Sequence, residues 1–248
     1  MEMFMNIFRD GLMLGLMGEL GITSGTTEFY FLLAGFVLLS VVASYLLGSL
    51  SSAIIVSRGL YKEDIRTHGS GNAGLTNMLR TYGKGAAALT LVGDMLKTAI
   101  AILITALLFG FSYEGGISMS GACYLSGTCA VLGHVFPIFY GFKGGKGVLV
   151  TATMALILCP LVFAILLAVF NIVVAISGYV SLGSIIVASL FPFAVCISSY
   201  LSGGEIPLLT AICTLFLGGF VVWCHRTNIG RLRSRTEKKI SIGKKEKK

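Results

Sequence analysis

The sequence VLVTATMALILCPLVFAILLAVFNIVVAISGYVSLGSIIVASLFPFAVCISSYLSGG occupies residues 148–204 and contains no Asp, Glu, Lys or Arg. A membrane-spanning helix needs about 20 apolar residues, so this stretch is long enough for more than one. Four further stretches carry almost no charge: residues 29–57, 85–111, 120–142 and 206–224. Because a backbone inside lipid must satisfy its own hydrogen bonds, and the alternation of a membrane β-barrel is absent, these stretches predict helices. The fold class is therefore all-α, a polytopic integral membrane helix bundle.

Charged residues are scarce in this chain. They make up 12% of its 248 residues, about half of the roughly 25% that is usual in a soluble domain. This composition argues against a soluble enzyme, a disordered protein or a nucleic-acid-binding module. The formal net charge of +8 does not reverse that conclusion, because residues 226–248 hold all of it and residues 1–225 are neutral overall. The basic tail indicates contact with anionic membrane lipids, and no nucleic acid is expected as a partner.

Lys and Arg residues predict the orientation of the bundle, because they gather on the cytoplasmic side of membrane proteins. All of them except Arg9 and Lys97 lie in residues 58–84, in the turn at 143–147 and in the C-terminal tail. Breaks at Pro160 and near residues 177–181 divide the long uncharged stretch, which gives about seven transmembrane helices, with the N-terminus outside and the C-terminus cytoplasmic. Five spans, with the same parity, are the alternative, because the segments on either side of Pro160 are short for full spans.

Three regions follow from this topology. Residues 1–27 are expected to form an N-terminal extracytoplasmic or interfacial extension, residues 28–240 a single membrane-embedded domain, and residues 241–248 a Lys-rich cytoplasmic tail. The six cysteines lie in or beside apolar stretches without the spacing of a metal site, and no carboxylates cluster as they would around a divalent cation. The sequence therefore predicts neither a metal ion nor another cofactor.

A polar, glycine-rich segment, HGSGNAGLTNMLR, interrupts the apolar pattern at residues 68–80, in the first cytoplasmic loop. Small residues let backbone N–H groups face an anion, and hydroxyl, amide and guanidinium groups add donors, which is the chemistry of a phosphate cradle. The candidate ligands are Ser70, Gly71, Asn72, Thr76, Asn77 and Arg80. The alternative is an ordinary turn between two membrane helices.

A second polar cluster begins at His134 and ends in KGGKG at residues 143–147, directly before an expected helix. Free N–H groups and the positive end of a helix both favour an anion there. The candidate ligands are Gly144, Gly145, Lys146 and Gly147. The segment is not a Walker A motif, since Gly145-Lys146 is followed by Gly147 and Val148 and not by the Ser or Thr of that motif, so a small phosphate is indicated and a nucleotide is not. The alternative is a basic turn that only fixes the topology.

The third cluster contains His225 and Asn228, which share a face of a continuing helix because they are three residues apart. The alternative is that the histidine marks the membrane interface and its basic neighbours contact lipid. Ser184 adds a hydroxyl near the same membrane face.

Asp94 and Lys97 are ionisable residues within an apolar stretch. They indicate function, because ionisable residues are costly in a membrane. The alternative is that they simply neutralise each other, since they are three residues apart on a helix.

Together these clusters resemble the bacterial membrane glycerol-3-phosphate acyltransferases that use acyl phosphate, the PlsY family. The matching strings, in order over about residues 40–240, are Gly48-Ser49, Asp64-Ile65-Arg66, Gly69-Ser70-Gly71-Asn72, Thr76-Asn77-x-x-Arg80, Asp94-x-x-Lys97, Gly133-His134-x-Phe136-Pro137, Lys143-Gly144-Gly145-Lys146-Gly147 and His225-Arg226-x-Asn228-Ile229. No single string is specific, whereas the set is.

The resemblance implies an enzyme that moves an acyl group from acyl phosphate to the 1-hydroxyl of sn-glycerol 3-phosphate, the first step of phospholipid synthesis. The expected partners are these two substrates and membrane lipids, and neither CoA nor acyl carrier protein is required. The implied location is the bacterial cytoplasmic membrane, with the active site facing the cytoplasm. An apolar groove within a helix bundle would suit the acyl chain.

The resemblance also implies roles for individual residues. The catalytic group is expected to be Ser70, Arg80, Lys146 and His225. The residues expected to bind substrate or phosphate are Gly71, Asn72, Thr76, Asn77, Gly144, Gly145, Gly147, Ser184 and Asn228. Supporting roles are expected for Asp94, Lys97, His134 and Glu237.

Two questions stay open from the residues alone. The proton of the attacking hydroxyl could pass to His225 or to a substrate phosphate, and covalent attack by Ser70 is disfavoured because no base is recognisable beside it. The alternative function is a permease for a small phosphate-bearing anion, although the sequence shows no internal repeat of the kind that transporters carry.

Overall fold

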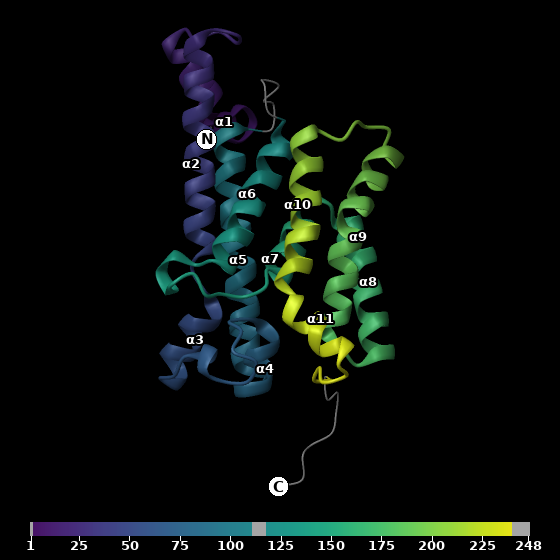
Figure 1. The fold of residues 1–248 in the computed structure, drawn as a ribbon. Coiled ribbons are helices and arrows are strands. Elements are labelled where there is room, and N and C mark those ends of the chain that lie inside the picture. Colours follow the sequence, from purple (N-terminus) through teal and green to yellow (C-terminus); the bar gives the residue numbers. More distant parts are fainter. Residues whose placement is uncertain (1, 111–117, 240–248) are drawn as a thin grey trace.

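The computed structural model describes residues 2–110 and 118–239, with side chains from residue 10 onward, and all regular structure within these parts is helical (Figure 1). The helices are α1 (Glu2–Leu20), α2 (Thr27–Gly48), α3 (Ser52–Tyr61), α4 (Leu75–Tyr82), α5 (Lys84–Phe109), α6 (Met119–Val135), α7 (Val148–Leu158), α8 (Pro160–Ser177), α9 (Val180–Leu201), α10 (Leu208–Cys224) and α11 (Arg226–Arg233), with short 3₁₀ turns η1 (Ile65–Thr67) and η2 (Ile138–Tyr140). The Lys-rich tail predicted at 241–248 lies outside the described residues.

The prediction of an all-α membrane protein is confirmed. Five helical stretches in the described part of the chain are long and apolar enough to cross a membrane, namely Thr27–Tyr61, Lys84–Phe109, Met119–Tyr140, Pro160–Ser177 and Val180–Leu201. A sixth is present if α10 and α11, bent by 53°, count as one broken span. With 11 residues, α7 is about 16 Å long, far less than the roughly 30 Å of a bilayer core. The count of seven spans and the orientation of the termini stay predictions.

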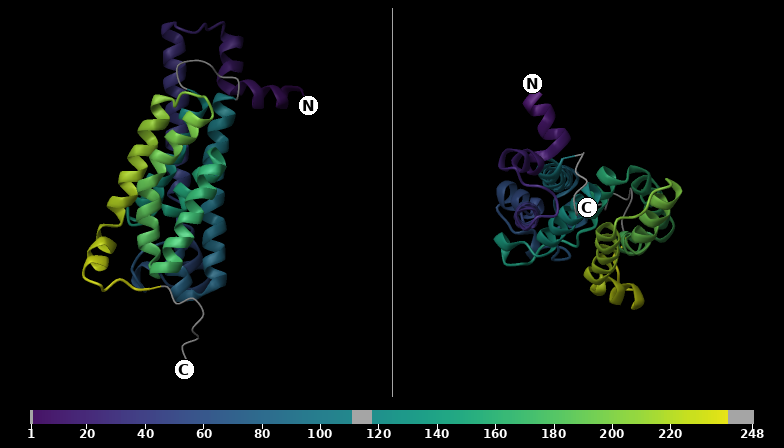
Figure 2. Two further views of the ribbon diagram at one scale, coloured as in Figure 1. Left: turned by 90° about the vertical axis from the view of Figure 1, so that its right-hand side faces the viewer. Right: turned by 90° about the horizontal axis from the view of Figure 1, so that it is seen from above.

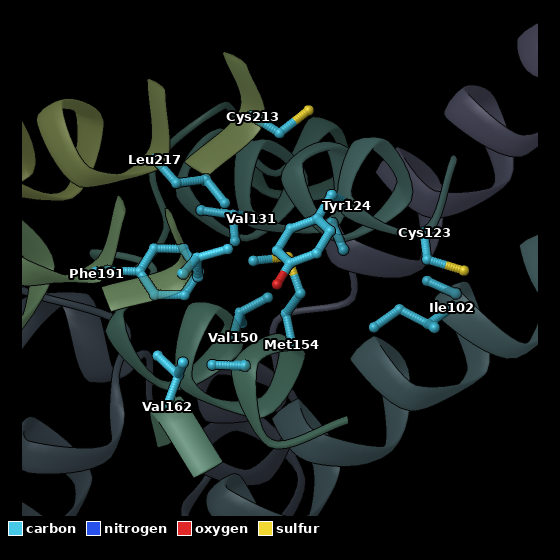
Figure 3. Packing of buried hydrophobic residues seen from close by; sticks show 14 of the residues in the cluster. Ile102, Cys123, Tyr124, Val131, Val150, Met154, Val162, Phe191, Cys213 and Leu217 are labelled. Atoms are coloured by element: carbon cyan, nitrogen blue, oxygen red, sulfur yellow. The ribbon is translucent and has the colours of Figure 1, made fainter. Parts of the chain in front are cut away.

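The short helix α7 lies between two groups of longer helices. On one side α2, α5 and α6 pack together, on the other α8, α9 and α10, and α7 contacts α5, α6 and α8 (Figures 1 and 2). Met154 of α7, Val131 of α6 and Leu217 of α10 are completely buried where these helices meet (Figure 3). Because α7 packs between other helices, the backbone N–H groups of its first turn can face an internal site without contacting lipid.

Small residues bring α2 and α6 close together. A Cβ at Gly48 would overlap the backbone of Ala130, and one at Gly133 would overlap the Tyr45 carbonyl. Ser44 and Ser126 form a hydrogen bond of 2.8 Å across the same interface. Such contacts are typical of membrane helices, which associate through close backbone packing and interhelical hydrogen bonds.

This packing predicts that Gly48→Val destabilises the protein by about 1–3 kcal/mol, the usual cost of overfilling a packed interface. The matched control is Gly219→Val on α10, because Gly219 is exposed and an added Cβ there meets no atom within 4 Å. Thermal unfolding in detergent measures the difference. An equal loss of stability in the two variants would contradict the close packing of α2 on α6.

The region predicted as an N-terminal extension contains α1, which bends at Gly11 (φ 75°). Its second half packs on α2 and α5 through Met13 and Met17, which are buried against Phe29 and Phe109. In the ribbon views α1 lies at the end of the bundle opposite α4 and α11 (Figures 1 and 2). The extension is therefore packed onto the bundle, away from the polar clusters; its boundary as a separate region stays a prediction.

Candidate functional site

A cavity of about 640 Å³ opens where the polar clusters of the sequence meet, between the loop before α4 and helices α5, α7, α8, α9, α10 and α11. Among the residues that line it are Ser70, Asn72, Thr76, Asn77, Arg80, Asp94, His134, Lys146, Gly147, Ser184, His225, Asn228 and Glu237. Gly71 and Gly145 line an adjoining pocket of about 240 Å³, which shares Ser70, Asn72, Lys146 and Arg231 with the cavity. The structure thus brings together candidates that are more than 150 residues apart in the chain.

The first glycine-rich loop is shaped by Asn77, whose side chain is 2% exposed. Its Oδ1 accepts a hydrogen bond from Ser70 N at 2.9 Å, and its Nδ2 donates to the carbonyls of His68 and Asn72, each at 3.0 Å. Asn77 was predicted to contact phosphate, but its amide is occupied by the loop itself. Its observed contacts hold Ser70 at the cavity, and the Ser70 side chain is left exposed.

Arg66 ties the first loop to the second. It binds the carboxylate of Asp64 at 2.8 Å and donates to the carbonyl oxygens of Tyr140 at 2.6 Å and Lys143 at 3.2 Å. The hydrogen bonds from Arg66, with a smaller contribution from Arg58, hold the pKa of Asp64 well below its usual range. Arg66 was not predicted as a site residue from the sequence, although its position two residues after Asp64 was a signal for such a role.

The second loop does not present all its N–H groups to the cavity. Gly144 N donates to Val135 O and Gly145 N to His134 O, each at 3.1 Å, so both are used to close the end of α6. Gly147 has a φ of 82°, a left-handed conformation that favours glycine, and it begins α7 without a side-chain cap. The donors that this loop offers to an anion are therefore Lys146 and the first turn of α7, in place of the predicted Gly144 and Gly145 N–H groups.

Lys146 is half-buried at the cavity and donates a short hydrogen bond to Asn228 Oδ1. Burial, and after it the nearby charge of Arg231, lowers the pKa of Lys146 to about 8, although Glu237 acts in the opposite direction. Lys146 therefore keeps its positive charge at neutral pH but loses it under mildly alkaline conditions.

Glu237 holds the C-terminal segment over the cavity. Its Oε1 accepts hydrogen bonds from Asn228 at 2.7 Å and Ser181 at 2.8 Å, and its Oε2 pairs with Arg231 at 2.7 Å. Desolvation acts against ionisation, but the hydrogen bonds from Arg231, Asn228 and Ser181 together lower the pKa of Glu237. The expected supporting role of Glu237 thus has a physical basis, because one carboxylate joins α9, α11 and the chain beyond α11.

Arg231 lines both pockets, although only topology and lipid contact were predicted for the basic residues after residue 225. The acidic Glu237, six residues further along the chain, was the feature of the sequence that could have indicated a role for Arg231. Arg80, on α4, reaches the same segment, since its guanidinium donates to the Lys238 carbonyl at 3.2 Å. The turn between α8 and α9 also lies here, with the Lys239 ammonium 5.4 Å from the Tyr179 ring. The cavity is thus bordered by several cations from separate elements.

His225 is 3% exposed at the junction of α10 and α11 and lines the cavity. Its Nδ1 lies 2.7 Å from the Val221 carbonyl oxygen. Because a carbonyl oxygen can only accept, Nδ1 carries the proton of the neutral ring, and Nε2 keeps a lone pair that can accept another.

Asp94 and Lys97 form an ion pair of 2.8 Å in α5, so the neutralising interpretation of this pair fits its geometry. Lys97 also donates to the Leu50 carbonyl at 2.9 Å and approaches His134 Nδ1 at 3.1 Å. All three side chains of this Asp94–Lys97–His134 cluster are buried. Asp94 and His134 line the cavity, whereas Lys97 lies behind them.

The rest of the cavity is lined mainly by apolar side chains, with Thr151 and Thr153 of α7 among them. It continues from the polar end between α5, α7, α8 and α9, along Met95, Leu149, Phe163, Phe170 and Val187. Within the described residues no group of His, Cys, Asp and Glu is arranged to hold a metal ion. One continuous space therefore joins a cationic, hydroxyl-rich end to an apolar channel.

Comparisons with known proteins agree on one family. The sequence model described as glycerol-3-phosphate acyltransferase matches residues 38–235. Proteins named glycerol-3-phosphate acyltransferase from Clostridioides difficile and Syntrophomonas wolfei are 42% and 41% identical to this chain; the alignments cover 83% and 81% of this chain and 95% of each relative.

Two crystal structures of PlsY, described as an integral membrane glycerol 3-phosphate acyltransferase, have the same fold. The glycerol 3-phosphate form matches with a TM-score of 0.70 and 31% identity, over 83% of this chain and 96% of that one. The lysophosphatidic acid form matches with a TM-score of 0.68 and 30% identity, over 83% and 95%.

Proposed function

Because the chain belongs to the glycerol-3-phosphate acyltransferase family, we propose that it transfers a fatty acyl group from acyl phosphate to the 1-hydroxyl of sn-glycerol 3-phosphate. The products are lysophosphatidic acid and inorganic phosphate. The observation that carries the choice of donor is the shape of the cavity, in which a cationic end continues into an apolar channel between α5, α7, α8 and α9. An acyl phosphate has the same two parts.

Both substrates carry a phosphate group, and the polar end offers cations from three separate elements. Arg80 lies on α4, Lys146 in the loop before α7 and Arg231 on α11. Charge-assisted hydrogen bonds to phosphate are roughly twice as strong as neutral ones, so these side chains can hold two anions side by side. The hydroxyl of Ser70 and the first turn of α7 would supply further donors to the reacting carbonyl oxygen.

An acyl phosphate is already activated, so the protein needs to align the reactants and remove one proton. The 1-hydroxyl oxygen forms a bond to the acyl carbonyl carbon, and the bond from that carbon to the phosphate oxygen breaks, with its electron pair leaving on the phosphate. The hydroxyl proton passes to His225 Nε2, the basic nitrogen left free by the Nδ1–H···O bond to Val221. Covalent attack by Ser70 is not part of this route.

The pKa of Lys146 leads to a prediction of how the activity depends on pH. Because its pKa in the free enzyme is about 8, kcat/KM should fall as pH rises through that value and the ammonium loses its charge. Lys146→Arg should remove this alkaline limb, since a guanidinium stays protonated. Initial rates of acyl transfer between about pH 6 and pH 9.5 test this. An alkaline limb that is the same in both proteins would contradict it.

The active site would face the cytoplasm of a bacterial cell. This orientation is supported by the basic residues of α11 and by Lys238 and Lys239 beyond it, which lie at the same end as the cavity. The permease alternative is less well supported, because the polar lining gathers at one end and the channel beyond it is apolar.

Purified protein in detergent, with acyl phosphate and glycerol 3-phosphate, tests the proposed function. The expected result is release of inorganic phosphate that depends on glycerol 3-phosphate. Acyl-CoA and acyl carrier protein thioesters serve as alternative donors and should support no transfer. If phosphate release required no acceptor, or the thioesters were the better donors, the proposal would be wrong.

A further inference from the structure

His134 is a buried ring whose role the mechanism above leaves open. It lies in the last turn of α6, is 4% exposed, and lines the cavity. From the sequence it was expected only to support the site. Its two nitrogens, however, have different surroundings, and this difference indicates a direct contact with substrate.

The Nδ1 side faces the interior. Lys97 Nζ lies 3.1 Å from Nδ1 and 2.8 Å from Asp94 Oδ1. A lysine ammonium is a donor only, so Nδ1 must accept its hydrogen bond. The Asp94 oxygen is 3.7 Å from Nδ1, too far to accept a proton from it. The neutral ring therefore carries its proton on Nε2, and the Asp94–Lys97 pair fixes that tautomer.

The Nε2 side faces the boundary between the two glycine-rich loops. A Cβ at Gly145 would overlap Nε2 and come within 2.9 Å of the Ala73 carbonyl, so glycine is what allows the ring to reach this boundary. No hydrogen bond to Nε2 is formed by any residue in the described part of the chain. Nε2 is not among the fully buried atoms that lack a partner, so it is accessible from the cavity to a bound acceptor.

The anion donors identified above lie on both sides of this position. Ser70 and Asn72 belong to the first loop and Lys146 to the second, and all three line the cavity with His134 as well as the adjoining pocket beside Gly145. The acceptor best suited to this arrangement is a phosphoryl oxygen, because it can take the Nε2–H bond together with a Lys146 ammonium.

We propose that His134 Nε2–H donates a hydrogen bond to a phosphoryl oxygen held between residues 68–74 and 143–147, and that the Asp94–Lys97 pair is a positioning device that keeps the proton on Nε2. The inference rests on the proposed function for the identity of the ligand, which is the phosphoryl group of acyl phosphate and, after transfer, inorganic phosphate.

Two amide variants separate the nitrogens. His134→Gln carries an amide near the position of Nε2, whereas His134→Asn reaches only to that of Nδ1 and keeps the contact with Lys97. Calorimetric titration with inorganic phosphate should show affinity lowered about 10–100-fold in H134N, the effect of losing a hydrogen bond to a charged group, and largely restored in H134Q. The double variant D94L/K97M, which leaves no unpaired charge, should also lower the affinity because it frees the tautomer.

Titration with glycerol 3-phosphate identifies which phosphate is bound. Unchanged affinity for glycerol 3-phosphate in H134N, together with weakened binding of inorganic phosphate, supports the contact with the donor phosphate. An equal loss of affinity for both ligands assigns the contact to the acceptor phosphate and overturns the inference. Unchanged affinity for both ligands in folded H134N overturns it. If H134N does not fold, the double variant D94L/K97M provides the test. The inference is then overturned if D94L/K97M binds phosphate as tightly as the wild type does. These titrations need no turnover, so an inactive wild type would contradict the proposed function alone.

Discussion

Replacing Lys146 with methionine is expected to lower kcat/KM for acyl transfer by about 10²–10³-fold, the usual effect of removing one charge-stabilising donor. Methionine keeps much of the side-chain length but removes the ammonium that faces the cavity and donates to Asn228. The loss should appear in kcat as well as in KM, because Lys146 would stabilise charge on the departing phosphate and would also help to hold it.

Lys143→Met is the matched control for Lys146→Met. Lys143 is in the same loop, exposed, and outside the residues that line the cavity. Within the described residues its side chain forms no hydrogen bond or ion pair, and its backbone carbonyl accepts a hydrogen bond from Arg66. Initial rates over a range of both substrates give the constants for each variant. Equal effects of the two substitutions would mean that Lys146 acts only through the basic character of the loop.

His225→Ala is expected to lower kcat by about 10²–10⁴-fold at saturating substrate, the range for loss of a general base. The structure motivates this size of effect, because the Nδ1–H bond to Val221 leaves Nε2 as a free base in the cavity. If KM rose while kcat stayed unchanged, His225 would be a binding residue and a substrate phosphate would take the proton.

His68→Ala serves as the control for the loss of a histidine. His68 Nε2 is 2.8 Å from the Glu63 carboxylate, and its side chain does not line the cavity. Activity close to that of wild type is expected for H68A. Thermal unfolding of both histidine variants in detergent shows whether any loss of rate reflects a loss of folded protein.

Much of the helical order could be predicted because lipid allows few alternatives. The uncharged stretch 148–204 contains the predicted break, with α7 ending at Leu158 and α8 beginning at Pro160, a favourable first position for proline in a helix. The bend of α1 at Gly11 could not be predicted, because it depends on the contact with Gly110, about 100 residues away. The short, internal α7 also depends on neighbours that composition alone does not reveal.

The sequence was sufficient to predict which residue types form the candidate site. It was less informative about which contacts those residues make. Arg80, Lys146 and His225 do line one cavity. Asn77, however, is occupied by its own loop, and the Gly144 and Gly145 N–H groups close α6. A motif shows which donors are present, but which of them stay free is decided by packing between distant segments.

The most direct test of the central claim is the stoichiometry of acyl transfer by the purified protein. Acyl phosphate and glycerol 3-phosphate are supplied together, and lysophosphatidic acid and inorganic phosphate are measured in the same samples. We predict that the two products appear in equal amounts, that neither forms without glycerol 3-phosphate, and that H225A and K146M lower both in parallel. Release of phosphate without lysophosphatidic acid would contradict the account, because the cavity would then not join the two substrates.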